Sequence, residues 1–167
     1  WFGVEIFIHN VAAIYYVDRF GLSLASAGMA AASFGLLALF ARALGGIVSD
    51  RMARSRGLDG RTLLLCVLML GEGLGLLAFA QADGVLLAVA AMLVFGLFTH
   101  MACGATYALV PFIDRNALGG VAGIIGAGGN VGAVAAGFLM KGLGDTQHTL
   151  SVLGVLVALS AVCAIAV

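Results

Sequence analysis

In the apolar run from Ala117 to Met140 the chain reads Gly126-Ala127-Gly128-Gly129-Asn130-Val131-Gly132. No charged residue lies between Arg115 and Lys141. A glycine in a helix in water costs about 1 kcal/mol relative to alanine, so four glycines within seven residues require a compensating role. In a bilayer, glycines let a second helix or a small ligand approach the backbone closely. The stretch predicts one wall of a solute path, formed by Gly126, Gly128, Gly129, Asn130 and Gly132.

The composition of the chain indicates a polytopic membrane protein. Of its 167 residues, 63% are hydrophobic and 10% are charged, with 25 glycines and one proline. A soluble domain of this size cannot bury so much apolar surface. The eight basic and eight acidic residues cancel, and the concentrated basic face that nucleic acid binding needs is absent. Cys66, Cys103 and Cys163 lie in apolar segments without metal-ligand spacing, which indicates helix packing.

Six apolar segments are long enough to cross a hydrocarbon core of about 30 Å. We place these spans near residues 1–19, 26–49, 62–81, 85–112, 117–141 and 149–167. The linkers between them carry glycine, proline, aspartate or asparagine, which are typical of turns. Since the chain starts and stops inside apolar sequence, we expect it to be a fragment of a longer protein.

The basic residues of the linkers predict the orientation in the membrane. One side carries Arg51, Arg54, Arg56, Arg61 and Arg115, and the other carries only Arg19 and Lys141. This difference places the loop at about residues 50–61 in the cytoplasm. With six spans, both ends of the fragment are then cytoplasmic, in a multi-pass protein of the cell membrane.

The first predicted span is the most polar one. Glu5 and His9 are four residues apart and therefore share a face of a helix. Two ligands do not make a closed metal site, and no third is evident in the sequence, so we expect no metal and no cofactor. The two side chains either face a water-filled interior or partner helices, or they handle protons.

The second predicted span contains Arg42, which precedes Asp50 by eight residues. This spacing puts Arg42 about 12 Å inside the membrane from the cytoplasmic loop. A guanidinium at that depth costs at least about 2.5 kcal/mol, and it must therefore meet a counter-charge. One interpretation is an ion pair with Glu72 or Glu5. The other is an anion site, because the guanidinium donates parallel hydrogen bonds to a planar oxyanion and stays charged.

Other polar residues of the spans have less defined roles. Glu72 lies between Gly71 and Gly73, and it could pair with Arg42, be protonated, or face the gap that the glycines leave. In the fourth span we interpret His100, Thr106 and Tyr107 as packing residues. The sequence shows no converging nucleophile and base of the kind an enzyme needs, and we therefore do not expect an enzyme.

The stretch after Arg42 reads Gly46-Ile47-Val48-Ser49-Asp50-Arg51-Met52-Ala53-Arg54-Ser55-Arg56-Gly57. It resembles the loop signature of the major facilitator superfamily, although Ala53 stands where glycine is commoner and Ser55 interrupts the basic run. The resemblance implies a gating latch in which Asp50, Arg51 and Arg54 hold neighbouring helix ends together. Topology marking by positive charge alone would also account for these arginines.

The glycine-rich stretch, extended to Gly123-Ile124-Ile125, resembles the second signature of the nitrate/nitrite porter family within this superfamily. Further likenesses follow in order along the chain, in the stretches Phe2-Gly3-Val4-Glu5, Asp18-Arg19-Phe20, Ala31-Ala32-Ser33-Phe34-Gly35, Ala102-Cys103-Gly104 and Val110-Pro111-Phe112. Membership implies the C-terminal half of a twelve-helix bundle, spans seven to twelve, with the N-terminal half missing. It also implies that Arg42 is one of two arginines that clamp the anion, opposite the backbone around Asn130.

The function that this resemblance implies is transport of nitrate, and of nitrite, by alternating access in a protein that works as a monomer. Uptake of a monoanion against an inside-negative potential needs cotransported protons or an exchanged anion. We expect proton-coupled symport for nitrate assimilation, with Glu5 and His9 as the proton-handling residues. A nitrate/nitrite antiporter, a facilitator for another small anion, and a structural subunit remain as alternatives.

Overall fold

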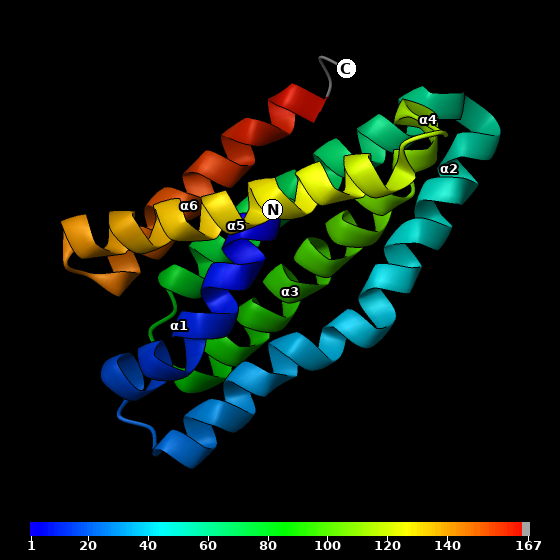
Figure 1. The fold of residues 1–167 in the computed structure, drawn as a ribbon. Helices are drawn as coiled ribbons and strands as arrows, with labels where there is room; N and C mark the ends of the chain where they lie inside the picture. The colour runs from blue at the N-terminus through cyan, green and yellow to red at the C-terminus, as the bar shows by residue number, and fades with distance from the viewer. Residues whose placement is uncertain (165–167) are drawn as a thin grey trace.

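The computed structural model describes residues 1–164 (Figure 1). The last three residues of the span predicted near 149–167 lie outside this range. The described elements are helices: α1 (Phe2–Phe20), α2 (Leu24–Ala80), α3 (Val85–Tyr107), α4 (Val110–Ile113), α5 (Leu118–Leu143), α6 (Thr146–Ser160) and the short 3-10 helix η1 (Ala161–Ala164). The all-helical class that the composition predicts is confirmed for these residues.

The predicted loop at residues 50–61 is helical on both sides of one break. At Gly57 the backbone leaves the helix with φ 61° and ψ −139°, a conformation that suits glycine because it has no Cβ. Figure 1 shows the chain of α2 turning back after its upper end and returning beside α3. A Cβ on Gly60 would lie 2.6 Å from the carbonyl oxygen of Met52, so this glycine also permits the tight reversal. We call residues 24–56 and 58–80 the first and second arms of α2.

Within the described residues, four helices are long and apolar enough to cross a membrane, rather than the six spans predicted. They are Leu24–Ala80, Val85–Ile113, Leu118–Leu143 and Thr146–Ala164. The 57 residues of α2 would measure about 86 Å if they were straight, which is more than twice a hydrocarbon core. α1 has the length of a span but contains Glu5, Asp18 and Arg19, which lower its apolar character.

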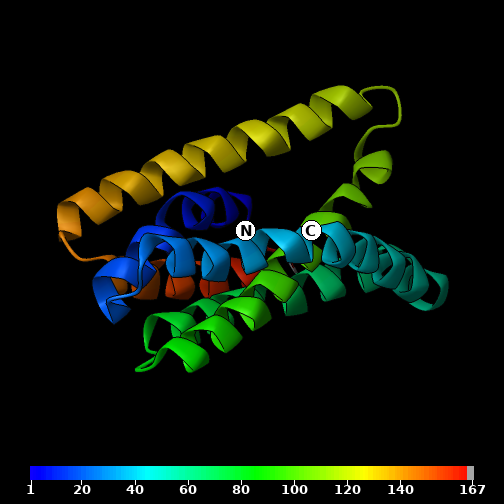
Figure 2. The ribbon, with the colours of Figure 1, turned by 90° about the horizontal axis from the view of Figure 1, so that it is seen from below.

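The helices form a packed group with α5 on its outside. Seen from below, α5 lies across α1, on the side away from α2, α3 and α6 (Figure 2). α5 contacts mainly α1, and its buried residues are Gly129 and Ala136. The remaining faces of α5, including Ile124, Val131 and Phe138, are exposed.

The core lies where α1, both arms of α2, α3 and α6 meet. Its largest fully buried side chains include Ile8, Tyr16, Phe34, Leu76, Phe79, Met92, Phe95 and Leu150. The rings of Phe34 and Phe95 stack with centroids 5.3 Å apart. Since these residues come from four helices, the core fixes the first arm of α2 against α3.

Glycines bring α2 and α3 into backbone contact. A Cβ on Gly45 would lie 2.1 Å from the carbonyl oxygen of Met101, and a Cβ on Gly104 would lie 1.9 Å from the carbonyl oxygen of Arg42. Contacts this close are possible only without side chains, as at other small-residue helix crossings in membranes. The crossing therefore fixes the height and direction of Arg42.

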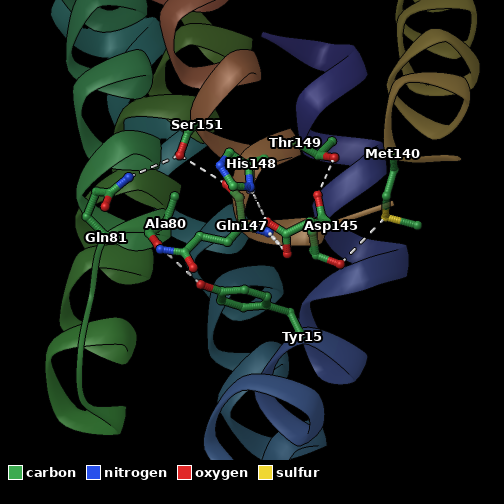
Figure 3. Close-up of polar contacts among 10 residues, drawn as sticks. Tyr15, Ala80, Gln81, Met140, Asp145, Gln147, His148, Thr149 and Ser151 are labelled. Atoms are coloured by element: carbon green, nitrogen blue, oxygen red, sulfur yellow. Dashed lines mark hydrogen bonds and ion pairs between the residues drawn. The ribbon is translucent and has the colours of Figure 1, made fainter. Parts of the chain in front are cut away.

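Polar contacts tie the helix ends together on one side of the molecule (Figure 3). The Tyr15 hydroxyl of α1 donates to the carbonyl of Ala80, 3.4 Å away, and the Gln81 amide donates to the Ser151 hydroxyl of α6 at 3.2 Å. Asp145 caps α6, because its carboxylate accepts the backbone N–H groups of Gln147 and His148. The hydrogen bond from the His148 N–H holds the pKa of the Asp145 carboxyl below its usual value.

A pair of neighbouring glycines tests the α2–α3 crossing. We expect Gly45→Ala to destabilise the complete protein by about 1 to 3 kcal/mol, since its Cβ would meet backbone that cannot rotate away. Gly46→Ala is the matched control, because its Cβ would meet the Gly104 carbonyl oxygen at an ordinary 3.9 Å. Unfolding by SDS in mixed micelles measures both variants. Equal destabilisation of the two would contradict the close crossing.

The α6 cap gives a second prediction. Asp145→Ala removes the acceptor of two backbone N–H groups, so the amides of Gln147 and His148 should exchange with solvent faster. Asp145→Asn keeps an acceptor oxygen and should exchange at nearly the native rate. Hydrogen exchange followed by mass spectrometry on the peptides at the start of α6 measures the difference. If both variants exchange alike, the carboxylate is not the cap.

Candidate functional site

Arg42 lies on the first arm of α2 and forms an ion pair with Glu5 of α1. One Nη2 atom of Arg42 contacts Oε1 of Glu5. The Glu5 side chain is only 3% exposed, whereas the Arg42 side chain is 46% exposed. Of the two interpretations that the sequence leaves open for Arg42, the structure shows the ion pair, with Glu5 and not Glu72 as the partner. Since this contact uses Nη2 alone and a guanidinium has several N–H groups, Arg42 retains N–H groups for a further acceptor.

His100 of α3 completes this cluster. Its Nδ1 lies 3.6 Å from Oε1 of Glu5, and its Nε2 lies 2.9 Å from the carbonyl oxygen of Phe34. The side chain is fully buried, so the interpretation of His100 as a mere packing residue misses its position beside a carboxylate. The signal in the sequence was the presence of a titratable residue deep in an apolar segment, which is a functional hypothesis by default.

His9 lies close to the cluster but does not contact the Glu5 carboxylate. Its Nδ1 is 2.9 Å from the backbone carbonyl of Glu5, one helical turn earlier. Its ring packs edge-on against Phe34 at 5.0 Å between centroids, and it lies 6.4 Å from the ring of His100. The prediction that Glu5 and His9 share a helix face is correct, although His100 is the imidazole nearer to the carboxylate.

The glycines of α5 divide into two groups. A Cβ on Gly129 would lie 1.9 Å from the Phe2 ring, and one on Gly132 would lie 3.2 Å from the backbone of Gly3. These two glycines therefore let α5 pack directly on α1. Gly126 and Gly128 have nothing within 4 Å of a built Cβ, so no neighbouring helix packs against them at these points.

Asn130 is exposed on α5, and its side-chain amide donates to the carbonyl of Gly126, 2.9 Å away in the same helix. Its hydrogen bond is therefore local rather than across to a neighbouring helix. Within the described residues, the structure does not bring Asn130 into contact with Arg42.

The best-formed cavity, of about 620 Å³, lies between α1, α5 and α6. Gly128, Gly129 and Gly132 line it together with apolar side chains, and Ser160 contributes a hydroxyl. Its lining within the described residues includes no charged side chain. An anion would find no counter-charge there, and we therefore place the candidate site at Arg42.

The basic segment near the Gly57 reversal is organised by Arg61, which the sequence suggested only as a topology signal. The Arg61 side chain is 8% exposed and pairs with Asp50 at 2.7 Å. It also donates to the Ser49 hydroxyl at 2.9 Å and lies over the Phe112 ring, 4.8 Å from its centroid. Arg51 and Arg54, which the resemblance to the loop signature implies as latch residues, are exposed.

Glu72 is fully buried on the second arm of α2. Neither of its carboxylate oxygens has a hydrogen-bond partner among the described residues. The flanking glycines bring neighbours close, since a Cβ on Gly71 would meet the Phe98 ring and one on Gly73 would meet the backbone of α6. Glu72 is thus a second buried glutamate, without the arginine and histidine that Glu5 contacts.

Residues 1–164 contain no group of three or more metal-ligating side chains.

Long apolar helices that surround a buried charge cluster define an integral membrane protein with a polar site at membrane depth. Its known relatives are transporters and not enzymes. The high affinity nitrate transporter 2.5 of Arabidopsis thaliana is 44% identical over 157 residues, which make up 93% of this chain and 31% of the relative. Nitrate transporter 2.1 of Chlamydomonas reinhardtii is 40% identical over 90% of this chain and 28% of its own length. Over most of its length the chain is similar to these nitrate transporters.

A cyanobacterial relative extends the comparison to nitrite. The nitrate/nitrite transporter NrtP of Picosynechococcus is 36% identical over 80% of this chain and 24% of its own length. The chain thus spans about a third or less of the curated relatives it matches. No family model and no solved structure matches the chain. The resemblance to the nitrate/nitrite porter family, predicted from the ordered motifs, is confirmed by these relatives.

A double-mutant cycle tests the Arg42–Glu5 pair. Arg42→Gln leaves the Glu5 carboxylate buried without a cation, and we expect a loss of about 1 to 3 kcal/mol of unfolding free energy. Adding Glu5→Gln should restore part of this loss, which gives a coupling energy above about 0.5 kcal/mol. The pair of Arg19 and Asp83, 3.7 Å apart and exposed, is the control and should couple by less. Additive effects at Arg42 and Glu5 would contradict the pair.

Proposed function

We propose that the protein to which this chain belongs transports nitrate, and also nitrite, across a cell membrane by alternating access. The relatives carry these substrates in their names. We propose that the chain forms the C-terminal six-span half of a twelve-helix bundle. In this arrangement α1 crosses the membrane once, the two arms of α2 cross twice, and α3 with α4, α5 and α6 supply the other three crossings.

The observation that carries the proposal is the half-exposed side chain of Arg42. Glu5 holds it from one side through a single carboxylate oxygen. A planar oxyanion can then accept hydrogen bonds from the N–H groups on the exposed side, in the forked geometry that arginine provides. In this proposal Arg42 is a fixed cation that pairs permanently with the Glu5 carboxylate and also binds the transported anion.

The second wall of the site, in this proposal, is the exposed part of α5. Gly126 and Gly128 expose backbone, and Asn130 adds an amide on the same helix. Gly129 and Gly132 have a different part, since they hold α5 against α1. The remaining contacts to the anion, including a second arginine, would come from the N-terminal half. Rocking of two such halves about a central site is the general mechanism of this class of transporter.

The driving force we propose is proton symport, which supports uptake for nitrate assimilation. An anion that enters against an inside-negative potential works against about 2.3 kcal/mol per 100 mV, and cotransported protons can offset this.

We propose the cell membrane as the location, a monomer as the working unit, and cytoplasmic ends for the fragment. The Asp50–Arg61 pair would then hold the helix ends together on the cytoplasmic side. Exchange of nitrate for nitrite is the alternative form of transport.

Counterflow of labelled nitrate into proteoliposomes with the complete protein tests the proposal. Arg42→Ala should lower the rate about 10- to 100-fold, because charge-assisted hydrogen bonds of about 1.5 to 3 kcal/mol are lost. Arg42→Lys should also be slow, since an ammonium lacks the fork. Arg115→Ala removes an exposed arginine near the end of α4 and should transport normally.

Two controls sharpen this test. The double variant Arg42→Gln with Glu5→Gln has no uncompensated buried charge, so it should fold. A loss of nitrate binding in it, compared with Glu5→Gln alone, would reflect the lost anion site rather than misfolding or the loss of Glu5. Unlabelled formate, phosphate and chlorate as competitors separate nitrate from other small anions. Normal counterflow in both Arg42→Ala and Arg42→Lys would refute the proposed site.

A further inference from the structure

We propose that Glu5 and His100 together form a proton site, and that this site takes up a proton when an anion binds to Arg42. The inference deepens the proposed function and rests on it, because it requires the anion at Arg42. It assigns the coupling of anion to proton to named atoms. It also replaces His9, the sequence-based candidate, with His100.

The tautomer of His100 follows from its contacts. The Phe34 carbonyl can only accept a hydrogen bond, so the His100 Nε2, 2.9 Å away, must carry a hydrogen and donate it. In the neutral ring Nδ1 is then an unprotonated acceptor. This nitrogen faces Oε1 of Glu5 at 3.6 Å. The two acceptor atoms therefore lie near each other with no hydrogen bond between them.

The burial of the two groups strengthens this assignment. Oε2 of Glu5 and Nδ1 of His100 are both buried, and neither has a hydrogen-bond partner among the described residues. Buried polar atoms without partners are rare in native proteins and call for an explanation. A proton on Glu5 Oε1 would give the carboxyl a donor, and a shortening of the 3.6 Å separation from His100 Nδ1 would then complete a hydrogen bond between them.

The titratable and charged groups around Glu5 come from three helices. His9 belongs to α1, Arg42 to α2, and His100 and Cys103 to α3, while Glu72 of the second arm of α2 is also within electrostatic range. Among the described residues, no charged side chain of α5 or α6 pairs with Glu5. Within residues 1–164, Arg42 is thus the one fixed cation that pairs with Glu5.

The net charge of the Arg42–Glu5 cluster couples the binding of the anion to the binding of the proton. Without an anion, Arg42 and the Glu5 carboxylate cancel. When a monoanion accepts hydrogen bonds from Arg42, the cluster becomes negative unless Glu5 takes up a proton from the water on the same side of the membrane. The new O–H bond on Glu5 then points to His100 Nδ1, and the cluster is neutral again. Since isolated charge at membrane depth is unfavourable, the anion and the proton each favour binding of the other.

The decisive experiment measures nitrate affinity of the purified, complete protein as a function of pH. In the wild type, Kd should rise by up to about tenfold per pH unit on the alkaline side, as expected when one proton binds with each anion. Glu5→Gln should make Kd independent of pH. Glu72→Gln is the matched control, since it removes a buried carboxyl that does not pair with Arg42. Its charge acts on Glu5 at a distance, so the pH range can move, but the slope should stay that of the wild type.

Because His100 acts through Glu5, its role is tested by a different quantity, the pH range over which Kd changes. His100→Gln should shift the pH range over which Kd changes, whereas His9→Gln should leave that range in place. A wild-type slope in Glu5→Gln, or a wild-type pH range in His100→Gln, would overturn the proposal. Should Glu5→Gln not fold, proton uptake by the wild type in weak buffer decides, with about one proton per nitrate expected and none overturning it.

Failure of this inference can be told apart from failure of the proposed function. If Arg42→Ala binds nitrate as tightly as the wild type at every pH, the anion site itself is wrong. If Arg42→Ala loses binding while Glu5→Gln keeps the pH dependence, the anion site stands and only the proton site is wrong.

Discussion

The ion pair between Arg42 and Glu5 is the interaction on which the rest of this structure depends. A guanidinium inside a membrane needs a counter-charge, and Glu5 supplies it from a different helix. The glycine crossing of α2 and α3 fixes the backbone of Arg42, and Gly3, two residues before Glu5, lies against Gly132 of α5. The pair therefore joins the packed group of α2 and α3 to α1, and through α1 to α5.

The pair also reconciles the two interpretations of Arg42, as a member of an ion pair and as an anion site, which the sequence analysis treated as alternatives. A permanent ion pair and an anion site both require a cation at membrane depth. Here the carboxylate is buried and the arginine is half exposed, so the same residue has a resting partner and an open side. In the proposed mechanism, protonation of Glu5 raises the affinity of Arg42 for the anion.

The sequence allows the helical class and the likeness to nitrate transporters to be predicted, because each depends on composition or on residues near one another in the chain. The role of Arg42 as an anion site stays a prediction. The positions of Phe34 and His100 relative to Glu5 could not be predicted, since they come from helices far apart in sequence. The helical reversal at Gly57 was missed because basic and polar residues around it are typical of a loop, while one glycine in an unusual conformation suffices to turn the chain. The sequence pattern assigns all the glycines of α5 to one wall, whereas the fold shows that some pack on α1 and others have no neighbour.

A structure of the complete protein, solved with and without nitrate, tests the central claim most directly. We predict that nitrate lies against the exposed side of the Arg42 guanidinium, and that without nitrate Glu5 is the only acidic partner of this arginine. A structure in which Arg42 is enclosed by protein carboxylates in both states, with nitrate bound elsewhere, would contradict the account.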